Sequence, residues 1–353
     1  SGRNGGSALT AAWRLMDIRE NVLLQSLTTF KVGGRARAVI HVDSTAALIG
    51  AIAYSKTQAL SWYVLGEGSN VLPPDEGYDG VVIRIDIPGI AFEVRGAETL
   101  VYAGAGVSWD ALVREVATRG LWGFENLAGI PGTVGAAPVQ NIGAYGADIS
   151  QTLHTVEVYD TLKEETYTIS ASDCALGYRD SRFKHEPHLI ITKVSFVLSS
   201  TSAPRIEYGD LLKAKEEGVD LSSPASIGDE VRLIRSKKFP DLSEFGTAGS
   251  FFKNPVITPE AYAALRDRYG EVPQFPHPHG IKIPLAFVLD KVLGMRGFRM
   301  GNAWLFGAQP LVLVLDANGT SIDIETLARE VEARVEETTG IKIEREVRTM
   351  PKK

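Results

Sequence analysis

The chain has 353 residues, of which 44% are hydrophobic and 23% charged, the balance of an ordinary folded protein of two or three domains. This composition excludes a disordered, collagen-like or disulfide-stapled chain. The chain has 37 basic and 43 acidic residues, so its net charge is −6. A protein with this charge lacks the overall positive potential that is typical of nucleic-acid-binding proteins. The single cysteine, Cys174, cannot form an internal disulfide, which fits a reducing compartment.

The first third of the chain predicts short strands and helices separated by glycine-containing turns. Strands are expected where β-branched and alternating apolar residues occur, and helices where an apolar face recurs: strands at 36–42, 62–65, 80–87 and 99–103, helices at 44–56 and 108–119. Ser44 is a candidate N-cap, and Gly120 is a typical helix end. The segment Ser1–Gly6 lacks the apolar core of a signal peptide and is expected to be either a disordered tail or an added remnant that is foreign to the protein.

The middle of the chain returns to β structure, and the last third mixes helices with strands. Strands are predicted at 155–160, 165–169, 189–198, 311–315 and 341–348, and helices at 259–268, 284–293 and 323–339. The last predicted strand places Glu346 on a charged side, where a glutamate is normally solvated.

Two glycine-rich segments stand out. Gly66-Glu-Gly-Ser-Asn70 follows a predicted strand but lacks the third glycine and the following helix of a Rossmann fingerprint. Such a loop can still hold a diphosphate on its backbone amides, although an ordinary turn is the alternative. The charge-free run 126–147 contains too many glycines, prolines and amides for a membrane span. It lets the backbone approach a planar ligand, or it is a tightly packed interdomain loop.

Two other residues could carry chemistry. Ser250 is not in a G-x-S-x-G elbow, so a serine hydrolase is unsupported, and it is either a proton donor or a structural serine. Arg179 beside Tyr178 suits a carboxylate or phosphate, with a surface ion pair to Asp180 as the alternative.

The histidines predict no metal site. The pairs His185–His188 and His277–His279 have no cysteine or acid cluster beside them, and surface loops explain both pairs.

Six motifs in order carry a resemblance to a known family: LGEGSNVL (65–72), ENLAGIPGTVGAAPVQNIGAYG (125–146), GYRDSRFK (177–184), YGDL (208–211), GSFFKNPV (249–256) and EREVR (344–348). Together they closely resemble the UDP-N-acetylenolpyruvoylglucosamine reductase (UDP-N-acetylmuramate dehydrogenase) family, in its longer form with a tyrosine loop. The match runs from about Leu27 to Arg348, nearly the whole chain.

The resemblance implies an α+β architecture. Two subdomains, at 17–88 and 89–238, would form an FAD-binding module of the vanillyl-alcohol-oxidase-like type. A third α+β domain at 239–340 would bind the substrate, and 341–353 would be a C-terminal strand carrying Glu346.

The resemblance also implies the reaction. NADPH reduces FAD, and hydride then passes to the enolpyruvyl ether of UDP-N-acetylglucosamine-enolpyruvate. A proton completes UDP-N-acetylmuramate, a peptidoglycan precursor used in cell wall biogenesis. The expected protein is a cytoplasmic monomer with no nucleic-acid or membrane partner.

Site residues follow from the matching positions. Ser250 would be the proton donor, and Arg179 with Glu346 would polarise the substrate carboxylate. The substrate-binding positions are Tyr145, Tyr208, Lys238, Asn254 and Gln309. The FAD-binding positions are Gly66, Glu67, Gly68, Ser69, Asn70, Val71, Ile130, Pro131, Gly132, Gly135, Ala136, Ile142, Gly143 and Ala144.

The chain departs from the family pattern at three places. Arg345 stands where proline is expected, Ala136-Ala137 where some relatives have a small hydroxyl pair, and Trp304–Phe306 where a less bulky segment is usual.

Two other readings remain at this point. A flavin oxidase of the same superfamily would explain the FAD loops but not Ser250, Tyr208 and Glu346 together. A catalytically silent flavin- or nucleotide-binding protein would not need Ser250, Arg179 and Glu346.

Overall fold

The computed structural model describes residues 16–352, so the tail expected at Ser1–Gly6 lies outside the described residues. The first sheet has the order β1-β2-β5-β3, with β1 at Ile18–Leu23, β2 at Arg35–Val42, β5 at Tyr78–Ile85 and β3 at Trp62–Leu65. Strand β1 is antiparallel to β2, whereas β2, β5 and β3 run parallel. Helix α2 (Thr45–Thr57) begins after the predicted N-cap Ser44, whose side chain accepts a hydrogen bond from the Ala47 amide at 3.2 Å.

The second sheet is antiparallel, in the order β11-β10-β12-β7-β6. Its strands are β6 Ile90–Arg95, β7 Glu98–Gly104, β10 Leu153–Asp160, β11 Glu165–Ser170 and β12 Leu189–Ser199. Helix α3 (Trp109–Thr118) packs over it, and the rings of Trp109, Phe124 and Phe196 meet with centroids 4.9 to 5.8 Å apart. Helix α6 (Pro224–Lys238), which the sequence analysis missed, packs on α3.

The glycine-rich run 126–147 forms loops and tight turns, as predicted. It contains the 3₁₀ turns Val134–Ala136 and Pro138–Gln140 and the short hairpin of β8 (Gly143–Ala144) and β9 (Ala147–Asp148). Over residues 16–352, no helix combines the length and the apolar character needed to cross a bilayer.

The C-terminal unit has its own core. Its elements are β13 Val256–Ile257, α7 Pro259–Tyr269, β14 Phe275–His277, β15 Gly280–Lys282, α8 Leu285–Phe287, the π-helical turn Val288–Val292, β16 Arg299–Met300, β17 Ala303–Phe306, β18 Gln309–Leu315 and α9 Ser321–Thr339. Phe30, Val32 and Leu72 from the start of the chain join this core. Asp75 also accepts hydrogen bonds from the first two amides of α9, at 2.8 and 3.0 Å. Burial and capping therefore both attach this unit to the first sheet.

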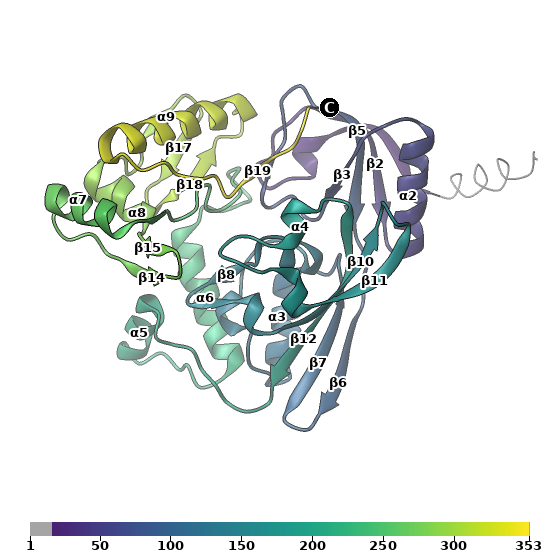
Figure 1. The fold of residues 1–353 in the computed structure, drawn as a ribbon, viewed down its shortest axis with the longest axis horizontal. Helices are drawn as coiled ribbons and strands as arrows, with labels where there is room; N and C mark the ends of the chain where they lie inside the picture. The colour runs from purple at the N-terminus through teal and green to yellow at the C-terminus, as the bar shows by residue number, and fades with distance from the viewer. Residues whose placement is uncertain (1–15, 353) are drawn as a thin grey trace, which may run out of the picture.

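The predicted strand at 341–348 is wrong over most of its length. Only β19 (Arg348–Thr349) is a strand, and it pairs in parallel with β4 (Val71–Leu72), directly after the loop 66–70. Residues 344–347 lie instead beside the loop at 251–253, which offers only isolated bridge partners and no continuous ladder. Figure 1 shows this yellow segment crossing from α9 to the first sheet.

Two short helices, α4 (Arg182–His185) and α5 (Gly209–Glu216), lie in the middle of the chain. Helix α5 lies at the edge of the molecule, below α7 in Figure 1, and packs on α6.

Candidate active site

Two adjoining cavities, of about 260 and 540 Å³, lie where the first sheet, the second sheet and the C-terminal unit meet. These three parts of the molecule are called the three units below. The two cavities are contiguous because both are lined by Ser69, Asn70, Pro131, Gln140 and Ile142. The first cavity lies between the first two sheets, and the second lies toward the C-terminal unit.

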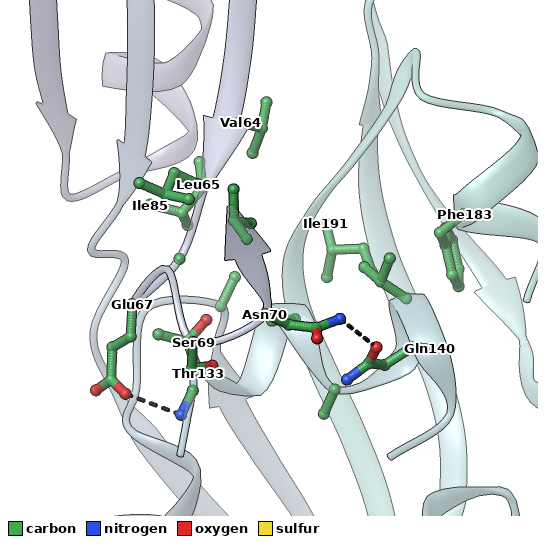
Figure 2. A pocket seen from close by; sticks show the side chains of 18 of the residues that line it. Val64, Leu65, Glu67, Ser69, Asn70, Ile85, Thr133, Gln140, Phe183 and Ile191 are labelled. Atoms are coloured by element: carbon green, nitrogen blue, oxygen red, sulfur yellow. Dashed lines mark hydrogen bonds between the residues drawn. The ribbon is translucent and has the colours of Figure 1, made fainter. Parts of the chain in front are cut away.

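The first cavity has apolar walls and a polar, glycine-rich floor. Val64, Leu65 and Ile85 come from the first sheet, and Phe183 and Ile191 face them from the other side (Figure 2). The predicted cofactor positions on its lining are Gly66, Glu67, Gly68, Ser69, Asn70, Val71, Pro131, Gly132, Gly135, Ala136 and Ile142. Ile130 and Gly143 line the second cavity, whereas Ala144 lines neither.

Hydrogen bonds hold the two glycine-rich segments together. The Glu67 carboxylate accepts from the Gly132 amide at 2.9 Å, as Figure 2 shows, and Ser69 Oγ donates to the Pro131 carbonyl at 3.2 Å. Asn70 Nδ2 donates to Gln140 Oε1 at 2.6 Å and to the Glu346 carbonyl at 3.2 Å. Asn70 thus joins both glycine-rich segments to the C-terminal residues.

Gly68 requires its residue type. Its φ is +66°, and a Cβ added there would lie 2.2 Å from the Leu27 carbonyl oxygen. Within residues 16–352, the amides of Gly68, Ser69 and Asn70 donate to no protein acceptor. A diphosphate fits such a set of free backbone donors, and the apolar walls above it suit an aromatic ring system. The first cavity therefore fits a flavin dinucleotide.

The second cavity brings together the three residues that the sequence analysis placed in catalysis. Arg179, Ser250 and Glu346 all line it, although they come from three distant segments. Arg179 Nε lies 2.8 Å from Glu346 Oε1, and another guanidinium nitrogen of Arg179 donates to the Gly143 carbonyl at 2.7 Å. Arg179 has a left-handed φ of +53°, a strained conformation that is common at functional sites.

The non-functional alternatives for Arg179 and Glu346, a surface ion pair with Asp180 and a solvated side chain, are wrong. The carboxylate that pairs with Arg179 is that of Glu346, whereas Asp180 Oδ1 lies 2.9 Å from His185 Nε2. The Glu346 side chain is only 11% exposed and is not solvated.

The surroundings of Arg179 stabilise its positive charge. Desolvation by burial opposes this charge, but Glu346 more than compensates, so the pKa of Arg179 is raised above its usual value. The buried Nε has no directed hydrogen bond to any described residue, despite its short contact with Glu346. The contact is therefore an ion pair and not a well-aligned hydrogen bond.

The five predicted substrate positions do not line either cavity. Three of them cluster: the Tyr145 and Tyr208 rings lie 5.2 Å apart, and the Lys238 ammonium lies 6.0 Å from the Tyr145 ring centre and pairs with Asp210. Burial raises the pKa of Tyr145 to about 12.

The other two predicted substrate positions belong to the C-terminal unit. The Asn254 amide donates to the Tyr178 hydroxyl at 3.2 Å, and its side-chain oxygen accepts from the Leu285 amide at 3.0 Å. Gln309 begins β18.

Two arginines that were not among the predicted site residues, Arg232 and Arg235, line the second cavity. Arg235, on α6, lines the second cavity and donates to the Gly129 carbonyl at 2.9 Å. Desolvation lowers its pKa. A signal for α6 was present, since Ser223-Pro224 with Ser226 forms a capping box.

No group of three or more histidine, cysteine, aspartate or glutamate side chains capable of holding a metal ion occurs within residues 16–352.

The chain is similar to known proteins over nearly its whole length. Residues 36–169 match the FAD binding domain family, and residues 241–350 match the C-terminal domain of UDP-N-acetylenolpyruvoylglucosamine reductase. The chain is 37% identical over 337 residues to the UDP-N-acetylenolpyruvoylglucosamine reductase of Chromobacterium violaceum, covering 94% of this chain and 98% of that protein. It is 39% identical over 329 residues to the enzyme of that name from Ralstonia nicotianae, covering 90% and 95%.

A solved structure agrees with these matches. The crystal structure of the reductase from Thermus caldophilus superposes with a TM-score of 0.67 at 26% identity, covering 96% of this chain and all of that one. The fold is thus an FAD-binding module of the vanillyl-alcohol-oxidase-like type followed by a C-terminal α+β domain.

Proposed function

Because the chain belongs to the UDP-N-acetylenolpyruvoylglucosamine reductase family, and is an FAD-dependent oxidoreductase of peptidoglycan precursor synthesis, we propose that its two cavities separate cofactor from substrate. The apolar walls of the first cavity and the amides of Gly68–Asn70 would hold FAD, the amides serving as donors for its diphosphate. The second receives the enolpyruvyl group of the sugar nucleotide. The proposed division is two FAD-binding subdomains at 17–88 and 89–238, a substrate domain at 239–340 and a C-terminal segment at 341–353.

Bound FAD, reduced by NADPH, supplies the hydride that adds to the terminal carbon of the enolpyruvyl double bond. The protein then has to stabilise negative charge that spreads into the substrate carboxylate. A guanidinium binds a carboxylate through two parallel N–H bonds, and Arg179 is buried, charged and already aimed at the cavity. Glu346 orients Arg179 and hydrogen-bonds the enol form of the intermediate.

Ser250 donates the proton to the carbon adjacent to the carboxylate, which completes UDP-N-acetylmuramate. A hydroxyl is a weak acid, but the intermediate is a strong carbon base, so transfer is favourable when the geometry is fixed. The single observation that carries this proposal is that Arg179, Ser250 and Glu346, from three distant segments, line one cavity.

The remaining predicted positions bind the nucleotide part of the substrate. Tyr208 and Lys238 suit its diphosphate, the first as a hydroxyl donor and the second as a point charge. The Lys238–Asp210 pair would open on binding. We further propose that the protein works as a cytoplasmic monomer without a nucleic-acid or membrane partner.

The experiment follows the visible spectrum of the purified protein without oxygen. NADPH should bleach the flavin band, and UDP-N-acetylglucosamine-enolpyruvate should restore it. In Ser250→Ala, bleaching should stay within twofold of wild type, and recovery should slow by about 10²–10⁴-fold. The control Ser243→Ala changes an exposed serine of the same loop and should leave both rates unchanged.

Other outcomes would reject the proposal in distinct ways. A band restored only by oxygen would identify an oxidase, and a band that never bleaches would identify a silent flavin-binding protein. Wild-type recovery in Ser250→Ala would remove the serine from its proposed role.

A further inference from the structure

Arg345 binds two carboxylates of α9 at once. Its Nε and one terminal nitrogen donate to the two oxygens of Glu332 at 2.5 and 3.0 Å, and its other terminal nitrogen donates to both oxygens of Glu325 at 2.9 and 3.0 Å. Arg345 is 23% exposed, Glu325 18% and Glu332 30%. The hydrogen bond with Glu332, aided by Glu325, raises the pKa of Arg345. This double fork is a rigid and partly desolvated contact.

The position of the two acids on the helix explains the geometry. Glu325 and Glu332 are seven residues apart, so they lie on the same face of α9, two turns apart. The planar guanidinium between them fixes Arg345 both along the helix axis and around it. A single ion pair would leave one of these directions free.

The backbone carries this placement toward the second cavity. Phe252 and Arg345 form an antiparallel bridge, the Lys253 amide donates to the Glu344 carbonyl at 2.8 Å, and the Glu346 amide donates to the Phe251 carbonyl at 2.8 Å. The adjacent Ser250 is held to β18 by its bridge with Val312. The segment 250–253 therefore lies between β18 and the C-terminal residues.

The side chains of consecutive residues point in opposite directions here. Arg345 faces α9, and the next residue, Glu346, faces Arg179 in the second cavity. Figure 1 shows the C-terminal segment running beneath α9 before it crosses to β19. Movement of Arg345 on the helix would move Glu346 relative to Ser250 and Arg179.

We propose that Arg345 is a positioning residue, which clamps the C-terminal segment to α9 and so fixes Glu346 against Arg179 and beside Ser250. This inference rests on the role proposed above for Glu346. Arg345 itself lines neither cavity, so it acts through its neighbour and not on the substrate.

The first test separates positioning from general stability. In Arg345→Gln, flavin reduction by NADPH should stay within twofold of wild type, whereas flavin reoxidation by the sugar nucleotide should slow by about 10- to 100-fold, the effect of a small misplacement. Arg345→Lys keeps the positive charge but loses the planar fork, so it can hold only one of the two carboxylates and its rate should fall between wild type and Arg345→Gln. The matched control is Arg329→Gln, which removes an exposed arginine 3.7 Å from the same Glu325 and should leave both half-reactions unchanged.

The second test asks whether Arg345 acts through Glu346. In a Glu346→Gln background, adding Arg345→Gln should slow reoxidation by less than twofold, because the group being positioned is already altered. Multiplicative effects of the two changes would overturn the inference. So would a lower melting temperature in Arg345→Gln with normal reoxidation, which would show a purely structural clamp.

Failure of the inference and failure of the proposed function give different results. If Glu346→Gln alone reoxidises at the wild-type rate, the role of Glu346 is wrong. If Glu346→Gln is slow but Arg345→Gln is normal, only the inference about Arg345 is wrong.

Discussion

Arg179 and Glu346 meet at 2.8 Å in the second cavity, although one lies in a polar loop of the middle segment and the other near the C-terminus. The acid nearest to Arg179 in sequence, Asp180, contacts His185 instead. The C-terminal segment reaches Arg179 because β19 pairs with β4 and residues 344–346 lie beside 251–253. The contact between the two side chains is thus a product of how three units are joined.

Replacing Arg179 by lysine should impair the second half-reaction. An ammonium lacks the planar fork, so it cannot contact Glu346, the Gly143 carbonyl and a substrate carboxylate together. We expect Arg179→Lys to slow flavin reoxidation by the sugar nucleotide about 10²-fold or more, the usual effect of losing a donor to developing charge. Stopped-flow absorbance measures this rate. Arg182→Lys, at a partly exposed pair with Glu186, is the control, and near-normal reoxidation in Arg179→Lys would remove it from the catalytic set.

Replacing Gly68 by alanine should weaken FAD binding. Gly68 and Gly96 share a φ of +66°, but a Cβ at Gly96 meets nothing within 4 Å, whereas one at Gly68 would lie 2.2 Å from the Leu27 carbonyl oxygen. Gly96→Ala therefore measures the backbone cost alone, about 1–2 kcal/mol. Gly68→Ala adds overpacking of about 1–3 kcal/mol and displaces the loop amides.

Thermal unfolding and the flavin content of the purified protein measure these two effects. Equal stability and equal flavin content in the two alanine variants would show that the space around Gly68 is not restrictive.

Low pH should weaken the hydrogen bonds by which Asp110 holds the glycine-rich run 126–147. Asp110 accepts from the Gly129 amide at 2.6 Å and from Arg232 Nε at 2.9 Å. Burial alone would raise the pKa of Asp110, but the bonds from Arg232 and Gly129 outweigh it and lower the pKa below its usual value. A depressed folded pKa adds stability that is complete above the unfolded value of about 3.9 and is lost as the pH falls through the folded value.

The comparison with Asp110→Asn isolates this contribution. The wild-type protein should be more stable than the variant at pH 6–7, and the difference in melting temperature should shrink below about pH 4. Circular dichroism between pH 7 and pH 3 follows both proteins. A difference that stays constant across this range would show that the charge of Asp110 does not contribute.

Local pattern was enough to predict many of the longer strands and helices of the fold, although it missed others such as β1, β6 and α6. Helix α2 starts after its predicted capping residue, Ser44. Helix α9 begins at Ser321, two residues before the predicted start at Asp323. Local pattern failed at 341–348, where alternation of charged and apolar residues resembled a strand. A strand needs a partner ladder, and only Arg348–Thr349 has one, on β4.

The sequence by itself determined the family and the glycine loops, because motifs such as 66–70 require their own residue types through φ and close approach. It also predicted which residues would be functional, since Ser250, Arg179 and Glu346 stood in matching motifs. Only the tertiary structure decided that these three share a cavity, that Arg235 lines it and that Arg345 binds α9. Those relations join segments far apart in the chain, and such contacts depend on packing between units, which no local pattern of residues encodes.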